Sequence, residues 1–169
     1  MFNAAAPDFS DPIGMLEACH GRIQAQCELL RRMSDYQGRH GVDQELTSAA
    51  QRVLRYFDIA APQHHADEEQ QLFPALAGNA ELQSLIQRLT AEHAEHDRLW
   101  QVLRLDLQRI MGGRPSRQLH EHSEPFIQAS LAHVSIENRR ILPHARASLD
   151  AQTLRKIGEA MAQRRQNAL

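Results

Sequence analysis

The sequence predicts an all-α protein, an antiparallel up-down-up-down four-helix bundle followed by a short C-terminal fifth helix. Apolar residues recur at alternating steps of four and three along four long segments, a pattern typical of helices with one buried face. The polar-apolar alternation of strands is missing from the sequence. Short stretches rich in glycine, proline or asparagine separate the segments, as expected where consecutive helices pack side by side in opposite directions.

Length and composition predict a single globular domain. The 169 residues include 42% hydrophobic and 24% charged residues, so we expect one domain over residues 1–169 with its bundle at about 10–148. The net charge of −2 comes with scattered basic residues, which argues against nucleic-acid or membrane-surface partners. No signal peptide and no membrane-spanning run is recognisable. Cys19 and Cys27 lie on one predicted helix, too far apart for a disulfide, which suits a cytoplasmic protein.

The first predicted helix opens at Asp11 and Pro12, because Asp suits the N-cap and Pro the first helical position. We expect it to end before the glycine-containing turn at residues 37–41. Its buried stripe contains a histidine and consists of Leu16, His20, Ile23, Cys27 and Leu30.

The second predicted helix starts near Val42 and Asp43, and its stripe also reaches a histidine. We expect Pro62 to kink this helix, Pro74 to bring it towards its end, and residues 78–79 to close it. The stripe consists of Leu46, Ala50, Val53, Phe57, Ala60 and His64.

The third predicted helix has the longest unbroken stripe. It consists of Leu82, Ile86, Leu89, His93, His96, Trp100, Leu103, Leu107 and Ile110. A loop over residues 112–116 follows, and Ser116 is a plausible N-cap for the next helix.

The fourth predicted helix carries a histidine and a glutamate on its buried face, and Pro125 and Pro143 are expected to bend it. That face consists of Leu119, Phe126, Ser130, His133 and Glu137. A short fifth helix over about residues 151–163 is expected to pack across one end of the bundle.

One motif occurs twice. His64 and Glu68, like His133 and Glu137, form a His-x-x-x-Glu pair with a proline ten residues after the histidine. A histidine also precedes each pair on the preceding helix, His20 by 44 residues and His93 by 40 residues. Each helical hairpin therefore supplies one half of a twofold-repeated constellation.

This constellation predicts a site for two metal ions. Residues four apart share one helix face, about 6 Å apart along the axis, so each His-Glu pair can reach one point in the bundle interior. Four imidazoles and two carboxylates suit two divalent cations, with both carboxylates bridging and a water or hydroxide completing the core. A donor set of nitrogen and oxygen without thiolate favours iron over a structural zinc cage, with manganese or zinc as possible substitutes. A lone histidine on an apolar face is more often a hydrogen-bonded core residue, but burying all six groups without a ligand would be costly.

The remaining histidines are weaker candidates. His96 lies on the third stripe and is either an additional ligand or a hydrogen-bonding neighbour of the ligands; His65 should flank the pocket, reaching one metal or pairing with Glu69. Asp97 is expected at the rim. Histidines expected in solvated turns or near helix ends are His40, His120, His122 and His144.

These residues resemble the hemerythrin-like HHE cation-binding domains. The resemblance is carried by His20, the run from His64 to Pro74, the pair Glu92 and His93, and the run from His133 to Pro143. It implies a four-helix bundle holding a non-haem di-iron centre, with Fe2+ or Fe3+ ions joined by an oxo or hydroxo bridge. The ligands it implies are His20, His64, Glu68, His93, His133 and Glu137, with Glu68 and Glu137 bridging.

The chain departs from the oxygen-carrying hemerythrins on the third helix. Those proteins carry His-x-x-x-His there, whereas Asp97 stands four residues after His93. The sequence is thus closer to a six-ligand HHE branch, and the resemblance does not by itself predict reversible oxygen transport.

Three functions remain open from the sequence. The first is a cytoplasmic di-iron protein, monomer or homodimer, that binds O2 or NO or senses iron and redox state. The second is a di-iron oxidoreductase that turns over peroxide or nitric oxide, in which His96 or His65 would donate protons. The third is an iron storage or buffering protein. In the first two the partner is a small diatomic or peroxide ligand.

Overall fold

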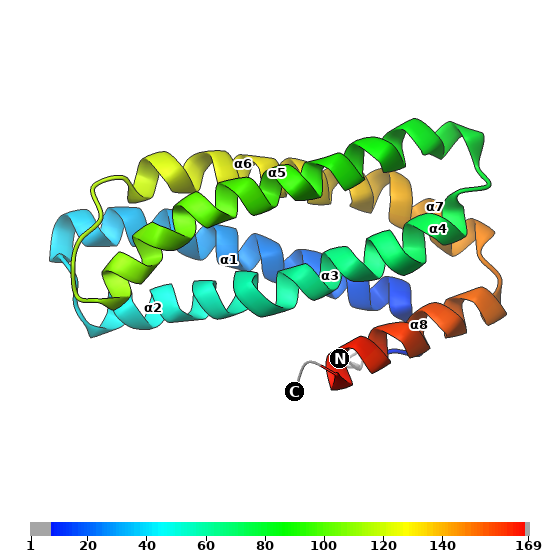
Figure 1. The fold of residues 1–169 in the computed structure, drawn as a ribbon, viewed down its shortest axis with the longest axis horizontal. Coiled ribbons are helices and arrows are strands. Elements are labelled where there is room, and N and C mark those ends of the chain that lie inside the picture. The colour runs from blue at the N-terminus through cyan, green and yellow to red at the C-terminus, as the bar shows by residue number, and fades with distance from the viewer. Residues whose placement is uncertain (1–7, 168–169) are drawn as a thin grey trace, which may run out of the picture.

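The computed structural model describes residues 8–167, and the elements within that range are all helical (Figure 1). Four rods run alternately in opposite directions, and a fifth helix follows them, so the predicted fold class is confirmed. The first rod is α1 (Pro12–His40) and the third is α5 (Ala80–Met111). The second rod is continuous through α2 (Gln44–Arg55), η1 (Tyr56–Ala60), α3 (Ala61–Asp67), η2 (Glu68–Leu72) and α4 (Phe73–Leu76). The fourth comprises α6 (Leu119–Ile136), η3 (Glu137–Ile141) and α7 (Leu142–Ser148), and α8 (Ala151–Gln166) completes the chain.

Short acidic side chains start the first two rods and α8. The Asp11 carboxylate accepts a hydrogen bond from the Gly14 amide at 2.9 Å, and Asp43 and Asp150 cap α2 and α8 in the same way. At the other end, α1 continues about one turn further than predicted and stops at Gly41, whose φ of 75° favours glycine.

Ser116 does not cap α6, contrary to our prediction. The N-cap is Gln118, which makes no side-chain capping bond. Ser116 instead donates to the buried Asp106 carboxylate at 2.5 Å, and His122 donates to the other oxygen of that carboxylate at 2.6 Å. Asp106 therefore holds the loop between α5 and α6 against the bundle.

Three π-helical turns each precede a proline of the second or fourth rod, whereas Pro125 of the fourth rod lies within the regular helix α6. Each π turn ends two residues before a proline. Pro62, Pro74 and Pro143 are therefore each the second residue of the α-helical segment that follows. A wider turn accommodates a residue that lacks the N–H group and crowds the preceding turn. Two of the turns, η2 and η3, begin at Glu68 and Glu137.

The π turns also explain an unusual spacing of buried residues. In the fourth rod His133, Glu137, Ile141 and Ala145 are all buried although they are four residues apart. On a regular α-helix each four-residue step turns about 40° too far, so three steps would rotate the last residue away from the core. A π turn takes up this drift and keeps both the glutamate and the following apolar residues facing inward.

The apolar core is divided into two clusters. One includes Ile23, Phe57 and Trp100, and the other includes Leu16, Leu72 and Ile141. Along each of the four rods the chain passes from one cluster to the other at the histidine or the His-Glu pair described above. A polar layer therefore crosses the whole bundle between two apolar blocks.

Helix α8 packs against α1 and α3 beside this polar layer (Figure 1). Its anchor is Asp67, which is fully buried and ion-paired with Arg164 and, at 2.6 Å, with Arg165. Asp67 directly precedes Glu68, so the C-terminal helix braces the turn that carries this glutamate.

Within residues 8–167 no helix combines the length and apolarity needed to cross a membrane.

We predict that Gly158→Ala destabilises the protein by about 1–3 kcal/mol, because a Cβ at this position in α8 would collide with the Phe9 carbonyl oxygen. Gly21→Ala is the matched control, since a Cβ there meets nothing within 4 Å. It should stabilise α1 by about 0.5–1 kcal/mol. Urea unfolding measures both; equal effects of the two substitutions would contradict this docking of α8.

Candidate metal centre

Six side chains from the four rods converge in the polar layer. His20 comes from α1, His64 from α3 and Glu68 from the start of η2; His93 comes from α5, His133 from α6 and Glu137 from the start of η3. All six are buried, with at most 4% of their surface exposed. These are the residues that the repeated motif and its upstream histidines singled out.

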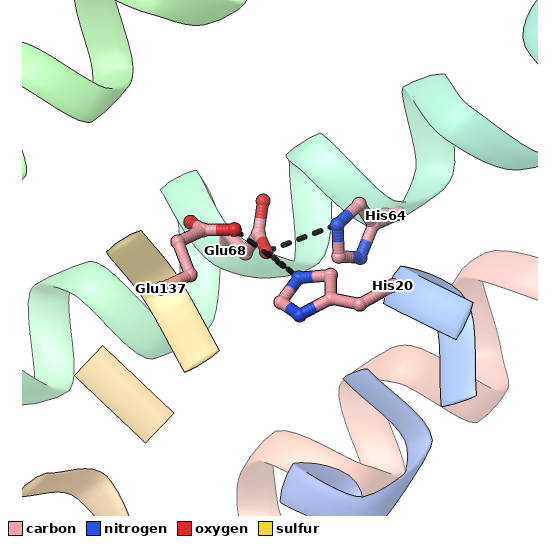
Figure 2. A group of neighbouring side chains, drawn as sticks. All are labelled: His20, His64, Glu68 and Glu137. Atoms are coloured by element: carbon pink, nitrogen blue, oxygen red, sulfur yellow. Dashed lines mark ion pairs between the residues drawn. The ribbon is translucent and has the colours of Figure 1, made fainter. Parts of the chain in front are cut away.

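The six side chains form two groups that share both glutamates. One group is His20, His64, Glu68 and Glu137, and the other is His93, His133 and the same two glutamates. Within each group the candidate donor atoms all lie within 4.8 Å of one another. Figure 2 shows the first group, with both imidazoles turned toward the carboxylates. Each group could hold one metal ion, and each carboxylate could contact both.

The donor atoms face each other at close range across the layer. His64 Nε2 lies 3.1 Å from Glu68 Oε1, and His93 Nε2 lies 3.4 Å from the other oxygen of Glu68. Glu137 repeats this arrangement, with His20 Nε2 at 3.1 Å from one oxygen and His133 Nε2 at 3.3 Å from the other. The two oxygens of each glutamate are thus directed to different groups.

Most of these atoms lack a hydrogen-bond partner. Among the described residues, the buried atoms without one include His20 Nε2, both ring nitrogens of His64, and all four oxygens of Glu68 and Glu137. Leaving one buried polar group unsatisfied costs about 1–3 kcal/mol, more when it is charged. Donors that converge without hydrogen-bond geometry fit a bound cation.

Three of the four histidines are oriented by hydrogen bonds from their outer ring nitrogens. His20 Nδ1 lies 2.6 Å from Asn138 Oδ1. His93 Nδ1 lies 2.6 Å from Glu69 Oε1, and His133 Nδ1 lies 2.9 Å from Glu92 Oε2. Because each partner atom is an oxygen acceptor, Nδ1 carries the proton in all three rings and Nε2 is directed inward, as in many metal-bound histidines.

With the protons on Nδ1, the unprotonated Nε2 atoms of two histidines repel each other. His93 Nε2 and His133 Nε2 lie 3.1 Å apart, and with both protons on Nδ1 their lone pairs face each other. A positive charge relieves the repulsion, either a proton on one ring or a metal ion near both.

Without metal, the site takes up protons. Burial lowers the pKa of His20, but Glu137 and Glu68 outweigh burial and raise it to about 10. Burial is outweighed in the same way at His133, where Glu137 raises the pKa to about 9. Burial would raise the pKa of Glu68, yet His64, His20 and His93 hold it well below its usual value. The Glu68 carboxylate is therefore ionised and attracts cations, whether protons or metal ions.

A small cavity of about 30 Å³ adjoins His133. It has room for roughly two waters. Its wall includes His65, His96, Trp100, Phe126 and Ser130, and the exposed residues Pro62 and Asp97 lie at its rim.

His65 and His96 lie beside the two groups without belonging to either. The His65 ring stacks on His93, with ring centroids 4.0 Å apart, and Glu69 pairs with His93 rather than His65. His96 is buried edge-on to His133, with ring centroids 4.9 Å apart. Burial, with smaller contributions from the neighbouring histidines, lowers the pKa of His96 to about 4 and holds that of His65 well below its ordinary value. Both rings are therefore neutral at physiological pH.

The remaining histidines stand away from the site. His40 and His120 are exposed, as expected. His122 is half-buried rather than solvated, because it pairs with Asp106. His144 lies in the short helix α7, near a helix end as expected, and its Nε2 lies 2.9 Å from Asn79 Nδ2.

The profile of the Hemerythrin HHE cation binding domain family matches residues 11–145. The chain belongs to this family. The match spans all four rods and includes every residue of the two groups, so this HHE domain is a metal-binding domain with a buried His/Glu cluster.

A relative of this HHE domain occurs in Haemophilus influenzae. It is 32% identical over 160 residues, which cover 94% of this chain and 92% of that protein. It is described as an uncharacterized protein, so the similarity supports the common domain and adds no activity.

The sequence did not identify which residues hydrogen-bond to the outer nitrogens of His20, His93 and His133. These are Glu69, Glu92 and Asn138, and each directly follows or precedes one of the six residues in the sequence. The signal for these partners in the sequence was a polar residue directly next to Glu68, His93 and Glu137. The pairing nevertheless crosses between helices: Glu92, which precedes His93, contacts His133.

We predict that metal binding at pH 7 displaces about two protons from the metal-free protein, because His20 and His133, with pKa values of about 10 and 9, are charged there and must lose their Nε2 protons to bind metal. Proton release should fall towards zero as the pH rises through 9 and 10, and metal affinity should rise over the same range. Calorimetry in two buffers of different ionisation enthalpy measures the number of protons. A heat independent of buffer at pH 7 would contradict the assignment.

Proposed function

We propose that this HHE domain is a non-haem di-iron protein that binds a small ligand such as O2 or NO and thereby senses or handles iron and redox state. In the proposal, His20 and His64 hold one ion, His93 and His133 hold the other, and Glu68 and Glu137 bridge them. The observation that carries it is the sharing of both carboxylates between two buried groups of four donors.

The donor set supports iron. Each group offers two imidazole nitrogens and two carboxylate oxygens and no thiolate, a set that suits iron, with manganese or zinc as substitutes. Four protein donors leave coordination positions open for an exogenous ligand. Bound iron would supply one-electron redox chemistry at those positions.

The cavity beside His133 supports a small exogenous ligand. At about 30 Å³ it suits a molecule of a few atoms and is far smaller than a pocket for an organic substrate. Its apolar wall from Trp100 and Phe126 favours uncharged diatomic molecules, while neutral imidazoles at His65 and His96 could hydrogen-bond to them. The domain's residues would thus admit, orient and shield the ligand.

Turnover of peroxide or nitric oxide is the second candidate. The observation that favours it is the pair of imidazoles, His65 and His96, in the wall of the same cavity. Storage or buffering of iron is less well supported, because the six donors are almost fully buried and burial slows exchange of the ions.

Metal analysis of anaerobically purified protein, followed by optical spectroscopy on exposure to air or NO, tests the proposal. We expect about two iron ions per chain and a new charge-transfer band that disappears when the gas is removed. Steady consumption of peroxide or NO with a reductant would favour the enzyme instead. Protein that neither retains iron nor takes it up would contradict both.

We predict that Glu68→Ala and Glu137→Ala each lose most of the bound metal, because each removes a donor from both groups. In the wild type, metal at 100 times its Kd stabilises the fold by about 2.7 kcal/mol, or about 5–10 °C in Tm for a chain of this length. This metal-dependent increment should vanish in both variants.

Glu95→Ala is the control for both substitutions, because Glu95 is exposed and, among residues 8–167, forms an ion pair only with Arg98. It should keep the full metal-dependent rise in Tm. Undiminished iron stoichiometry in Glu68→Ala and Glu137→Ala would refute the bridging role.

A further inference from the structure

The two halves of the site differ in the groups that contact the outer ring nitrogens of their histidines. On the His93–His133 side, both outer ring nitrogens contact carboxylates: Glu69 at 2.6 Å and Glu92 at 2.9 Å. On the other side, the outer nitrogen of His20 contacts the neutral amide oxygen of Asn138 at 2.6 Å. The inner donors follow a twofold repeat, but the groups that contact the outer nitrogens of the histidines do not.

His64 strengthens this contrast. Within residues 8–167, the only carboxylate in an ion pair with His64 is the bridging Glu68. Cys19 lies close to His64, and its sulfur accepts a hydrogen bond from Arg22 at 2.9 Å. The His20–His64 side thus has no carboxylate of its own behind its imidazoles.

Carboxylate partners change what an imidazole can do for a metal. A carboxylate that accepts the Nδ1 proton fixes the ring and makes Nε2 a stronger donor, and removing such a partner typically costs 10- to 100-fold in metal affinity. Glu92, which is half-buried, would also place a negative charge near one ion, whereas the charge of the exposed Glu69 is largely screened by solvent. Arg88 offsets part of the Glu92 charge, because it donates to the outer oxygen of Glu92 at 2.7 Å, but Arg88 is well exposed and its charge is screened by solvent.

We propose that the two metal positions differ in affinity. The His93–His133 position fills first and holds its ion more tightly, because Glu69 and Glu92 accept hydrogen bonds from its histidines. This rests on the proposed dimetal function and goes beyond it: when metal is limiting, the domain carries one ion, on the side that borders the cavity through His133. The His20–His64 position is then the exchangeable one and can accept a different metal.

Anaerobic calorimetric titration of the metal-free protein with Co2+ tests this inequality. The wild type should bind two ions in two resolved steps that differ by at least 10-fold in affinity. Glu69→Gln and Glu92→Gln should each weaken binding at the His93–His133 position by 10- to 100-fold, so that the two steps draw together, and leave affinity at the His20–His64 position nearly unchanged. Glu95→Gln removes an exposed carboxylate of α5, the helix that carries Glu92, and should change neither step.

A variant that adds a carboxylate at the His20–His64 position should increase its affinity for metal. Asn138→Asp places a carboxylate against His20 Nδ1 and should strengthen the second step by about 10-fold or more, so that the two steps draw together. Weakening of both steps by this substitution would overturn the proposal.

Two histidine variants identify which position is which. His64→Ala should keep the tight first step and lose the second, whereas His133→Ala should lose the tight step, with folding of each checked by circular dichroism. The reverse pattern would overturn the order of filling. Two equal steps in the wild type, unaffected by Glu69→Gln or Glu92→Gln, would overturn the inequality and leave dimetal binding intact. Absence of any Co2+ binding by the folded wild type would overturn the proposed function itself.

Discussion

The structure depends on six buried donors that point at one another and need a positive charge between them. Glu68 and Glu137 place four carboxylate oxygens without hydrogen-bond partners in the middle of the bundle, and the Nε2 atoms of His93 and His133 face each other at 3.1 Å. Protons partly meet this need in the metal-free protein, which is why the pKa values of His20 and His133 rise so far. The rest of the bundle can be understood as support for this layer: two apolar blocks close it from either end, and α8 is locked onto the buried Asp67 beside it.

The π turns connect the covalent sequence to this layer. A glutamate four residues after a histidine is already well placed by a regular helix, but the next buried residues at four-residue steps would drift away from the core. Widening the helix by one residue directly after Glu68 and Glu137 lets each rod bury its glutamate and then return an apolar residue, Leu72 or Ile141, to the second cluster. The prolines that follow fit the widened turn. Each copy of the His-x-x-x-Glu motif is thus followed by a π turn that begins at its glutamate, once in each helical hairpin.

Much of the fold and of the inner site could be predicted from the sequence because both depend on periodicity. The stripes through His20, His64, His93 and His133 are buried as their spacing predicts, except that Ala60 and Ile86 are only partly buried, and the structure brings all six predicted donors together. The outer partners could not be predicted, since contacts such as Glu92 with His133 depend on how two rods are rotated against each other, which no local pattern encodes. The same holds for Asp67, whose partners on α8 lie almost a hundred residues away in the sequence. The π turns η2 and η3 left a signal, three consecutive four-residue steps around a proline, which a regular α-helix with 3.6 residues per turn does not accommodate.

Anomalous X-ray scattering at the iron edge, from crystals of the anaerobically loaded protein, would locate the metal ions in the bundle. We expect two separate peaks in the polar layer, one beside His20 and His64 and the other beside His93 and His133, with Glu68 and Glu137 in contact with both. One peak lying outside this layer, or two peaks with either glutamate turned away to solvent, would contradict this arrangement.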